Sequence, residues 1–328
     1  MSWDLIGHQW TVGLLHEHVA RKSLRHAYLI TGPQGVGRRT LALRLSQAVN
    51  CLQPPEPGEP CGACRPCTLI GRMQHPDLAV VQATQVGGTL KVDQIRELQS
   101  SLSLTPYEAQ YRVAVLLRFE EAHISAQNAF LKTLEEPPPR VILLVTAESP
   151  ERLLPTVVSR CEVIRLRPLP VDEVSQGLEE RWGIPQDQAL LLAHLSGGRP
   201  GYALRLHQHP EMLENRRLRL EDHQRLLTWS RAQRLEYAEK LVKDKEGLLI
   251  TLQTWSSLWR DVLICAAGSA SPLVNLDRAD DIARLAARFG LRRANEVVAA
   301  IQRTSDLLDH NVNPRLATEV LMLDLPYL

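Results

Sequence analysis

Apolar residues follow two different spacings along the first half of the chain. They recur every three or four positions over residues 10–20, 41–49 and 92–102, which predicts amphipathic helices. Between such segments lie short apolar runs typical of strands, at residues 24–31, 77–82, 112–117, 141–146 and 162–166. Strands that are apolar on both faces and alternate with helices indicate a parallel, doubly wound sheet.

The pattern changes after residue 168. Strand-like runs disappear, short helices are predicted for residues 171–209, and longer helical patterning continues from residue 210 to residue 328. A chain of 328 residues is long enough for two or three domains that each bury a core.

A glycine-rich stretch follows the first predicted strand, over residues 29–40 (LITGPQGVGRRT). A phosphate-binding loop has a glycine, four residues, a second glycine, then lysine and serine or threonine. Gly32 and Gly37 fit this spacing, and Gly35 adds backbone freedom that lets successive N–H groups converge on an anion. The sequence therefore predicts the geometry of such a loop.

The two residues after Gly37 depart from that pattern. Arg38 stands at the lysine position and can contact a phosphate only as a broad planar fork. Arg39 stands at the position of the magnesium-binding hydroxyl, which it cannot replace, and Thr40 comes one residue late. The sequence therefore disfavours ATP binding, although nucleotide binding without hydrolysis stays open.

Carboxylates are expected near the end of the strand at residues 112–117, where nucleotide hydrolases of this fold hold magnesium and position water. Leu117 occupies the strand end, and Glu120 and Glu121 follow several residues later. If the strand ran on through Phe119, both glutamates could still serve in that role, but we prefer to interpret them as solvated side chains that begin a loop.

Four of the six cysteines cluster in a proline-rich insertion: Cys51, Cys61, Cys64 and Cys67. Tetrahedral zinc needs four converging thiolates, and C-x-x-C turns supply such pairs. Free thiols and an iron–sulfur cluster are the alternatives. We predict a closed structural zinc site without a vacant catalytic position.

Charge and hydropathy exclude several classes of protein. The 38 basic and 37 acidic residues nearly cancel, so no overall field attracts nucleic acid. No apolar run is long enough to cross a bilayer, and the start of the sequence lacks a signal-peptide layout. We expect no membrane partner and a cytoplasmic location.

Five stretches together resemble the bacterial DNA polymerase III clamp-loader subunits of the AAA+ superfamily. They are residues 26–29 (HAYL), 32–40, 50–51 with the three later cysteines, 128–138 (NAFLKTLEEPP) and 159–161 (SRC). The resemblance covers residues 1–205 well, and the last third of the chain only by its helical character.

The departures from the motor subunits point to the delta-prime branch of this family. Motor subunits keep the lysine, the hydroxyl and the strand-end carboxylates, whereas this chain has Arg38, Arg39 and Leu117. Motor subunits also carry a phosphate-sensing arginine where this chain has Gly201, with Arg199 two residues earlier. The delta-prime branch loses the loop residues but keeps the zinc site and the Ser-Arg-Cys arginine.

The resemblance implies an α/β fold: an AAA+ P-loop-type parallel sheet domain over residues 1–168, with a zinc-binding insertion at residues 51–67. It further implies a small helical lid at residues 169–209 and an all-α collar at residues 210–328. The expected partners are the gamma/tau motor subunits and delta, and, through the complex, the sliding clamp and primed template DNA. Such a subunit has no ATPase of its own, although it is part of the DNA-directed DNA polymerase III holoenzyme. Arg160 is expected to act in trans as an arginine finger at a neighbour's ATP site.

Three alternatives remain at this stage. The chain could be a working AAA+ ATPase, gamma/tau-like, in which Arg38 and Thr40 take over the phosphate and magnesium roles. A zinc-finger DNA binder is disfavoured because the insertion has few basic residues and no aromatic residue. Arg160 could also simply pair with a nearby carboxylate such as Glu162.

Overall fold

Five parallel strands form the centre of the first part of the chain in the computed structural model, which describes residues 3–85, 87–310 and 312–328. The strands are β1 (Ala27–Thr31), β2 (Leu78–Val81), β3 (Arg112–Leu116), β4 (Val141–Ala147) and β5 (Glu162–Arg165). Their order across the sheet is β2-β3-β4-β1-β5, and every neighbouring pair is parallel. The predicted parallel sheet of five strands is confirmed.

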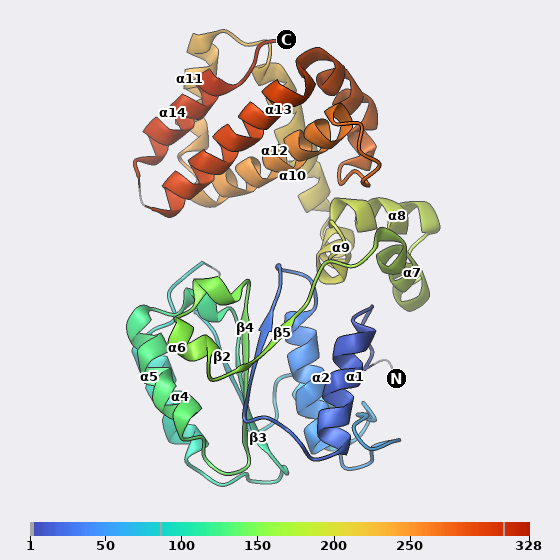
Figure 1. The fold of residues 1–328 in the computed structure, drawn as a ribbon, viewed down its shortest axis with the longest axis vertical. Helices are drawn as coiled ribbons and strands as arrows, with labels where there is room; N and C mark the ends of the chain where they lie inside the picture. The colour runs from blue at the N-terminus through green and yellow to red at the C-terminus, as the bar shows by residue number, and fades with distance from the viewer. Residues whose placement is uncertain (1–2, 86, 311) are drawn as a thin grey trace. The chain divides into compact units, whose positions relative to one another are not determined.

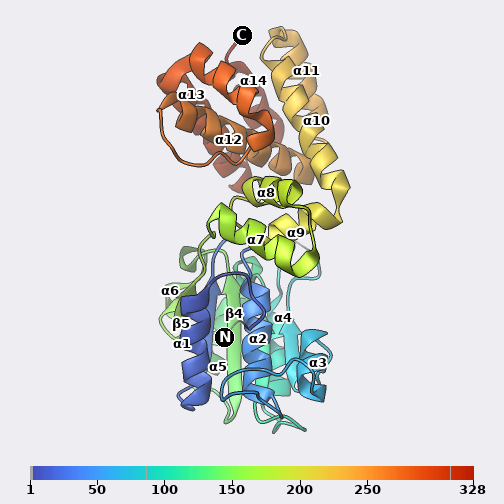
Figure 2. The ribbon, with the colours of Figure 1, turned by 90° about the vertical axis from the view of Figure 1, so that its right-hand side faces the viewer.

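Helices cover both faces of this sheet, as the continuous apolar strands require (Figure 1). On one face, α1 (Gln9–Ala20) and α2 (Arg38–Asn50) lie side by side (Figure 2) and pack on alternate strand residues. On the other face lie α4 (Val92–Leu102), α5 (Ile124–Glu135) and α6 (Pro155–Val158). The first face presents Tyr28, Ile30, Val113, Val115, Ile142 and Leu144, and the second presents Leu29, Ala114, Leu116, Leu143 and Val145.

Because the strands are parallel, all of them begin at one end of the sheet and finish at the other. We call these two ends the amino edge and the carboxyl edge. Chain segments that enter strands lie at the amino edge, and segments that leave strands lie at the carboxyl edge. The glycine loop leaves β1 and therefore lies at the carboxyl edge, whereas Arg160 precedes β5 at the amino edge. In register, Tyr28 of β1 lies opposite Glu162 of β5.

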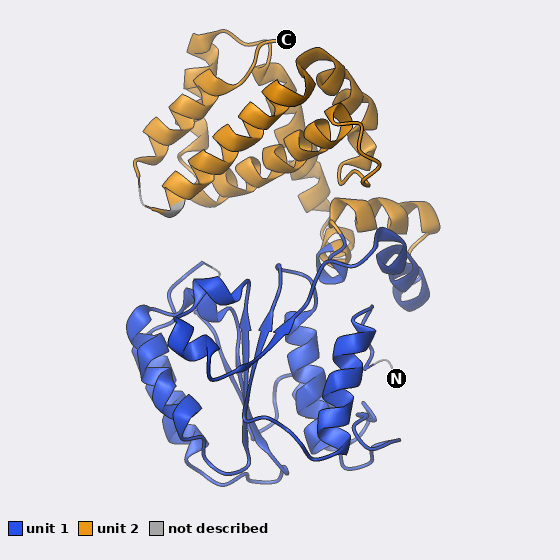
Figure 3. Ribbon diagram, in the orientation of Figure 1, with its two compact units in different colours: residues 1–183, 198–202 blue, residues 184–197, 203–328 orange. Residues whose placement is uncertain are grey.

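The chain divides into two compact units (Figure 3). The first comprises residues 1–183 and 198–202, and the second comprises residues 184–197 and 203–328. In the predicted lid, α7 (Val171–Trp182) belongs to the first unit and α8 (Gln186–Leu195) to the second, while α9 (Pro200–Gln208) begins in the first unit and continues in the second. The division into three domains at residues 168 and 209 therefore stays a prediction.

The second unit is helical throughout its long C-terminal part, as predicted. Its helices are α10 (Pro210–Leu226), α11 (Arg231–Leu241), α12 (Lys245–Ala266), α13 (Ala279–Asp309), which bends at Gly290, and α14 (Pro314–Asp324). Trp255 and Trp259 of α12 are fully buried in its core. Arg234 is also fully buried, because its guanidinium donates to the backbone carbonyl oxygens of Met322, Leu325 and Pro326 at the end of α14.

A buried carboxylate at the start of β2 holds the loop that leads into β3. Asp77 accepts hydrogen bonds from the backbone N–H groups of Tyr107 (2.7 Å), Glu108 (2.9 Å) and Ala109 (2.9 Å). The guanidinium of Arg112 lies 3.1 Å from the same carboxylate. Burial alone would raise the pKa of Asp77, but these donors outweigh it and hold the pKa below its usual range.

Replacing Asp77 by alanine should therefore destabilise the protein strongly. Removal leaves three N–H groups and a largely buried guanidinium without their acceptor, so we expect a loss of about 3 kcal/mol in the free energy of unfolding. Because the folded-state pKa is depressed, the contribution is complete above the unfolded pKa of about 4 and is lost as the pH falls through the folded value. Urea unfolding of wild type and Asp77→Ala at pH 7 and pH 3 should show a smaller difference at pH 3, which lies below the unfolded pKa.

Asp93→Ala is the matched control. Asp93 is exposed and pairs only with Arg96 on the same helix, at 3.3 Å, among the contacts of the described residues. Its removal should change the free energy of unfolding by less than about 0.5 kcal/mol. Equal effects of the two substitutions would contradict the role given to Asp77.

Candidate functional site

The loop between β1 and α2 has the backbone of a phosphate-binding loop. Gly32, Gly35 and Gly37 have φ angles of 145°, 85° and 115°, which favour glycine. A Cβ atom on Gly32 would lie 2.3 Å from the carbonyl oxygen of Leu166, so no larger residue fits there. The three glycines are therefore required by the shape of the loop, whatever it binds.

Arg38, the first residue of α2, points into the protein rather than into solvent. Its side chain is 8% exposed, and its Nη1 lies 3.8 Å from Oε1 of Glu120, whose side chain is 9% exposed. Glu120 belongs to a short 3-10 helix, η1 (Phe119–Glu121), that follows β3 at the carboxyl edge. Arg38 and Glu120 thus form a buried ion pair beside the glycine loop.

This geometry corrects the sequence interpretation of the two glutamates. Neither is a solvated carboxylate: Glu120 faces Arg38, and Glu121 lies 2.9 Å from Arg118 and accepts a 3.1 Å hydrogen bond from the N–H of Gly87. The chain reverses at Arg118, whose φ of 50° is left-handed, and this turn returns the glutamates to the sheet edge. The strand ends at Leu116, and the residue directly after it, Leu117, is buried and apolar, so no carboxylate stands at the strand end itself.

The electrostatics of the pair reflect its burial. Loss of solvent lowers the pKa of Arg38 and raises that of Glu120, because burial disfavours the charged form of each group. Arg38 Nη1 and Glu120 Oε2 also lack a hydrogen-bond partner within the described residues. Glu120 contributes most to keeping Arg38 charged, followed by Glu148, whereas Glu120 is kept charged first by a backbone N–H group and then by Arg38.

Arg39 and Thr40 lie apart from this pair. Both are exposed on α2, and Nη2 of Arg39 lies 3.2 Å from the sulfur of Met73. Together with Leu43, Arg44, Gln47 and Gly71 they line a crevice of about 390 Å³. Of the three residues predicted after Gly37, the structure brings only Arg38 to the carboxylate.

The start of α9 covers the glycine loop from within the same unit. The N–H of Gly201 donates to the carbonyl oxygen of Gly35 (2.8 Å), and a Cβ atom on Gly35 would lie 2.8 Å from the backbone nitrogen of Tyr202. The guanidinium of Arg199 lies over the Tyr202 ring, 4.6 Å from its centroid, with Nη1 3.5 Å from the carbonyl oxygen of Gln34. Gly201 thus meets the loop through its backbone, and Arg199 lies near the loop.

Arg160 is held at the opposite edge of the sheet. Its Nη1 donates to the carbonyl oxygen of Thr156 (2.9 Å), and its Nη2 lies 2.7 Å from Oε1 of Glu135, at the end of α5. The sequence left open that Arg160 pairs with a nearby carboxylate such as Glu162. The structure shows a carboxylate pair, but its acidic partner is Glu135, while Glu162 pairs with Arg25 at 3.2 Å. Glu135 was missed because it is distant in sequence from Arg160.

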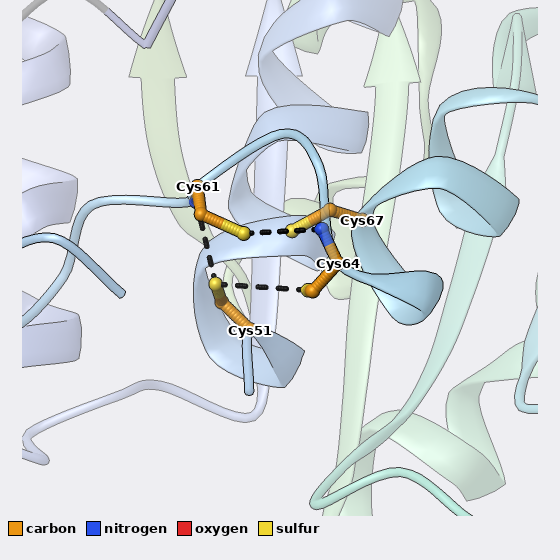
Figure 4. A group of neighbouring side chains, drawn as sticks. All are labelled: Cys51, Cys61, Cys64 and Cys67. Carbon is orange, nitrogen blue, oxygen red and sulfur yellow. Dashed lines mark hydrogen bonds between the residues drawn. The ribbon is translucent and has the colours of Figure 1, made fainter. Parts of the chain in front are cut away.

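The four clustered cysteines converge on one point (Figure 4). Cys51 ends α2, Cys61 and Cys64 lie in the following loop, and Cys67 lies in α3 (Arg65–Gly71). Their sulfur atoms all lie within 4.8 Å of one another, and those of Cys51 and Cys64 are 3.9 Å apart. A tetrahedral zinc with Zn–S distances of about 2.3 Å needs sulfur atoms about 3.8 Å apart, so the cluster fits a single metal ion.

The surroundings of the cysteines also suit thiolate ligands. Backbone N–H groups of Cys61 and Cys64 donate to the sulfur atoms of Cys51 (3.3 Å) and Cys61 (3.2 Å). The N–H of Cys64 lowers the pKa of Cys61 to about 6, whereas burial raises the pKa values of Cys51 and Cys67. The buried thiols are the ones that a bound cation would have to deprotonate.

Comparison with known proteins gives this geometry a family context. A family model described as "DNA polymerase III, delta subunit" matches residues 7–170, and one described as "DNA polymerase III, delta subunit, C terminal" matches residues 210–326. The chain is 33% identical over 252 residues to DNA polymerase III subunit delta' of Pseudomonas aeruginosa, a match that covers 76% of this chain and 71% of that protein. It is 29% identical over 317 residues to subunit delta' of Bacillus subtilis, covering 94% and 93% of the two chains.

A tau subunit matches over a shorter length. The chain is 33% identical to DNA polymerase III subunit tau of Bacillus subtilis over 159 residues, which cover 48% of this chain and 28% of tau. Separately, within the described residues, we find no helix with the length and apolar character needed to span a membrane.

The cysteine cluster should bind one zinc ion per chain. Elemental analysis of the purified protein should return one equivalent of zinc, and Cys64→Ser should lose most of it. Because metal binding contributes directly to local folding, the variant should show faster amide hydrogen exchange in residues 51–71, with the main sheet unchanged. Cys265→Ser, at an exposed cysteine outside the cluster, is the control. Iron in place of zinc, or no metal, would refute this assignment.

The protein should be destabilised when one partner of the Arg38–Glu120 ion pair is replaced, but much less when both are replaced by apolar residues. Glu120→Gln leaves the buried guanidinium without its main counter-charge, and we expect a loss of about 3 kcal/mol in the free energy of unfolding. The double variant Arg38→Met/Glu120→Leu should recover most of that loss, since an apolar pair needs no desolvation of charge. Arg39→Met, at the exposed neighbour, should stay within about 0.5 kcal/mol of wild type. A stable Glu120→Gln variant in urea unfolding would mean that Glu120 is solvated.

Proposed function

The chain belongs to the delta' family of DNA polymerase III clamp-loader subunits, and we propose that it is a non-catalytic member that completes the ATP site of a neighbouring subunit. In this proposal it assembles with gamma/tau motor subunits and with delta. The resulting complex loads the sliding clamp on primed DNA. The match to delta' of Bacillus subtilis over 93% of that protein supports a role for the whole chain rather than for one domain.

The observation that carries the non-catalytic role is the buried pair of Arg38 with Glu120. The residue at the lysine position of the loop is already engaged by a carboxylate of the same chain, at 3.8 Å. Arg39 lies exposed where a magnesium-binding hydroxyl would be needed, and Thr40 is exposed as well. The loop therefore offers neither a free compact cation for a phosphate nor a hydroxyl for magnesium.

The position of Arg160 supports a role in trans. Arg160 precedes β5 at the amino edge, whereas the glycine loop leaves β1 at the carboxyl edge. The five residues of β1 separate these levels by about 16 Å, at about 3.3 Å per residue. A side chain at this place cannot reach the loop of its own chain, so any phosphate that it contacts belongs to another subunit.

Head-to-tail rings use heterologous interfaces, in which each subunit presents one face to the nucleotide site of the next. A guanidinium that arrives from outside stabilises the charge that develops on the transferred phosphoryl group, because it is planar and always protonated. The helical second unit, which contains the region matched by the C-terminal family model, is the part that we propose holds the ring together. Zinc bound by the four cysteines would have a structural role.

A second candidate function is an ATP-hydrolysing motor subunit. The 33% identity with tau over 159 residues favours it. It requires Arg38 and Thr40 to serve phosphate and magnesium, and Thr40 is exposed on α2. Magnesium-dependent ATP turnover by the purified chain alone would support this candidate over the first.

The proposed function is tested by Arg160→Ala in a complex reconstituted with motor subunits and delta. The variant should fold, keep its zinc and join the complex, but lower the ATPase of the complex. A finger contributes on the order of 10³–10⁵ in turnover at the site it serves. Only one ATP site of the ring would lose its finger. The ATPase rate of the complex should therefore fall by about the fraction that this site contributes, and by more if the sites act in concert.

Arg21→Ala is the matched control, because Arg21 is an exposed arginine paired with a carboxylate, Glu17, at 3.6 Å on α1. This control should leave the ATPase and the clamp loading of the complex unchanged. If Arg160→Ala behaves like Arg21→Ala in both assays, Arg160 is not a finger. If the wild-type chain fails to join the complex, the assembly role itself is wrong.

A further inference from the structure

Two different helices fix the guanidinium of Arg160. One contact is local: Nη1 donates to the carbonyl oxygen of Thr156, four residues earlier, and lies 3.5 Å from Oγ of Ser159. The other comes from α5, whose last residue, Glu135, places Oε1 2.7 Å from Nη2. The local contact alone leaves the guanidinium able to adopt other orientations, and the contact with Glu135 restricts them.

The helices behind these two side chains make the arrangement rigid. Phe130 and Leu134 of α5 and Val157 of α6 are buried in one apolar cluster against the sheet. Prolines at positions 137–139 end α5 directly after Glu135 and Glu136. The backbone positions that carry Glu135 and Arg160 are therefore fixed relative to each other, in contrast to those of residues on a long loop.

The arrangement leaves part of the guanidinium available. An arginine has five N–H donors, and the contacts with Thr156, Ser159 and Glu135 use three at most. At least two donors remain for an acceptor outside the chain. The side chain of Arg160 is 36% exposed and that of Glu135 50%, so both can be reached from outside.

We propose that Glu135 is a positioning residue for Arg160: its carboxylate orients the guanidinium so that the remaining N–H groups face the nucleotide of the neighbouring subunit. This proposal rests on the proposed function of Arg160 in trans. Glu135 itself touches no nucleotide. An arginine has several rotatable bonds, and fixing it before the neighbour arrives reduces the entropy that is lost when the site forms.

The exposure of the pair sets the size of the effect. An ion pair that is one-third to one-half exposed biases an orientation by a factor of about two to five. That factor is too small to lock the arginine away from a phosphate, which binds a guanidinium through two charge-assisted hydrogen bonds. It is large enough to raise the fraction of Arg160 side chains that point in the productive direction.

The test uses complexes reconstituted with wild type, Glu135→Gln, Arg160→Ala and the double variant Glu135→Gln/Arg160→Ala. Glu135→Gln should lower the part of the ATPase rate that depends on Arg160 by about two- to five-fold. The change should be in kcat, with KM for ATP unchanged, because a finger acts on the transition state. In the Arg160→Ala background the second substitution should have no further effect.

Glu136→Gln is the matched control. Glu136 is the next residue and is exposed, and its side chain makes no ion pair or hydrogen bond with the described residues. It should leave the ATPase at the wild-type rate. Glu135→Asp, which keeps the charge on a shorter side chain, should restore part of the rate lost in Glu135→Gln.

The outcomes separate this inference from the proposed function. If Arg160→Ala lowers the rate but Glu135→Gln does not, or raises it, Glu135 is not a positioning residue and the finger stands. If Glu135→Gln lowers the rate equally in the Arg160→Ala background, its effect does not pass through Arg160, and the inference is wrong. If Arg160→Ala has no effect, both the finger and its positioning are wrong.

Discussion

The common direction of the five strands decides where each functional side chain of the first unit lies. Since all strands run the same way, the glycine loop must leave β1 at one edge and Arg160 must enter β5 at the other. The five residues of β1 separate the two groups, so they cannot meet within one chain. In the function that we propose, Arg160 serves the nucleotide of a neighbouring subunit, and this role does not depend on the glycine loop of its own chain.

The buried pair of Arg38 and Glu120 shows that the residue at the lysine position of the glycine loop is already engaged by the same chain. Burial opposes both charges, and their 3.8 Å separation recovers only part of that cost, so the pair is a weak source of stability. An apolar pair of similar volume would stabilise the fold to at least the same extent. The pair engages the side chain at the lysine position with a carboxylate of η1, which follows β3. In addition, the N–H of Gly201 donates a hydrogen bond to the carbonyl oxygen of Gly35. The loop is thus held by its own chain through contacts that need no nucleotide.

The sequence predicted the regular parts of the fold well, because they depend on periodic burial. All five strands and the helical C-terminal part were recognised from apolar runs and helical spacing, and the cysteine cluster from its C-x-x-C turns. Partner choice between polar side chains was predicted poorly. Glu162 lies two residues from Arg160, yet Arg160 pairs with Glu135, because the packing of α5 on α6 sets that distance. Glu120 was named in the sequence analysis but interpreted as solvated. The chain reversal that buries it depends on a left-handed conformation at Arg118, and an arginine gives no sequence signal for that conformation.

The cysteine cluster has a mechanical consequence at the amino edge. The insertion after α2 is rich in proline and has little apolar surface of its own, so four thiolates on one ion would supply the order that a core cannot. The helix that this ion would fix, α3, carries Arg65, which lies 3.6 Å from Glu108. Glu108 belongs to the loop whose N–H groups donate to Asp77. The cysteine insertion, this loop and strands β2 and β3 are therefore connected by direct contacts. Arg160 also precedes its strand at this amino edge, but β5 lies at the opposite side of the sheet from β2, so a metal here would order the surface beside β2 and β3 rather than Arg160.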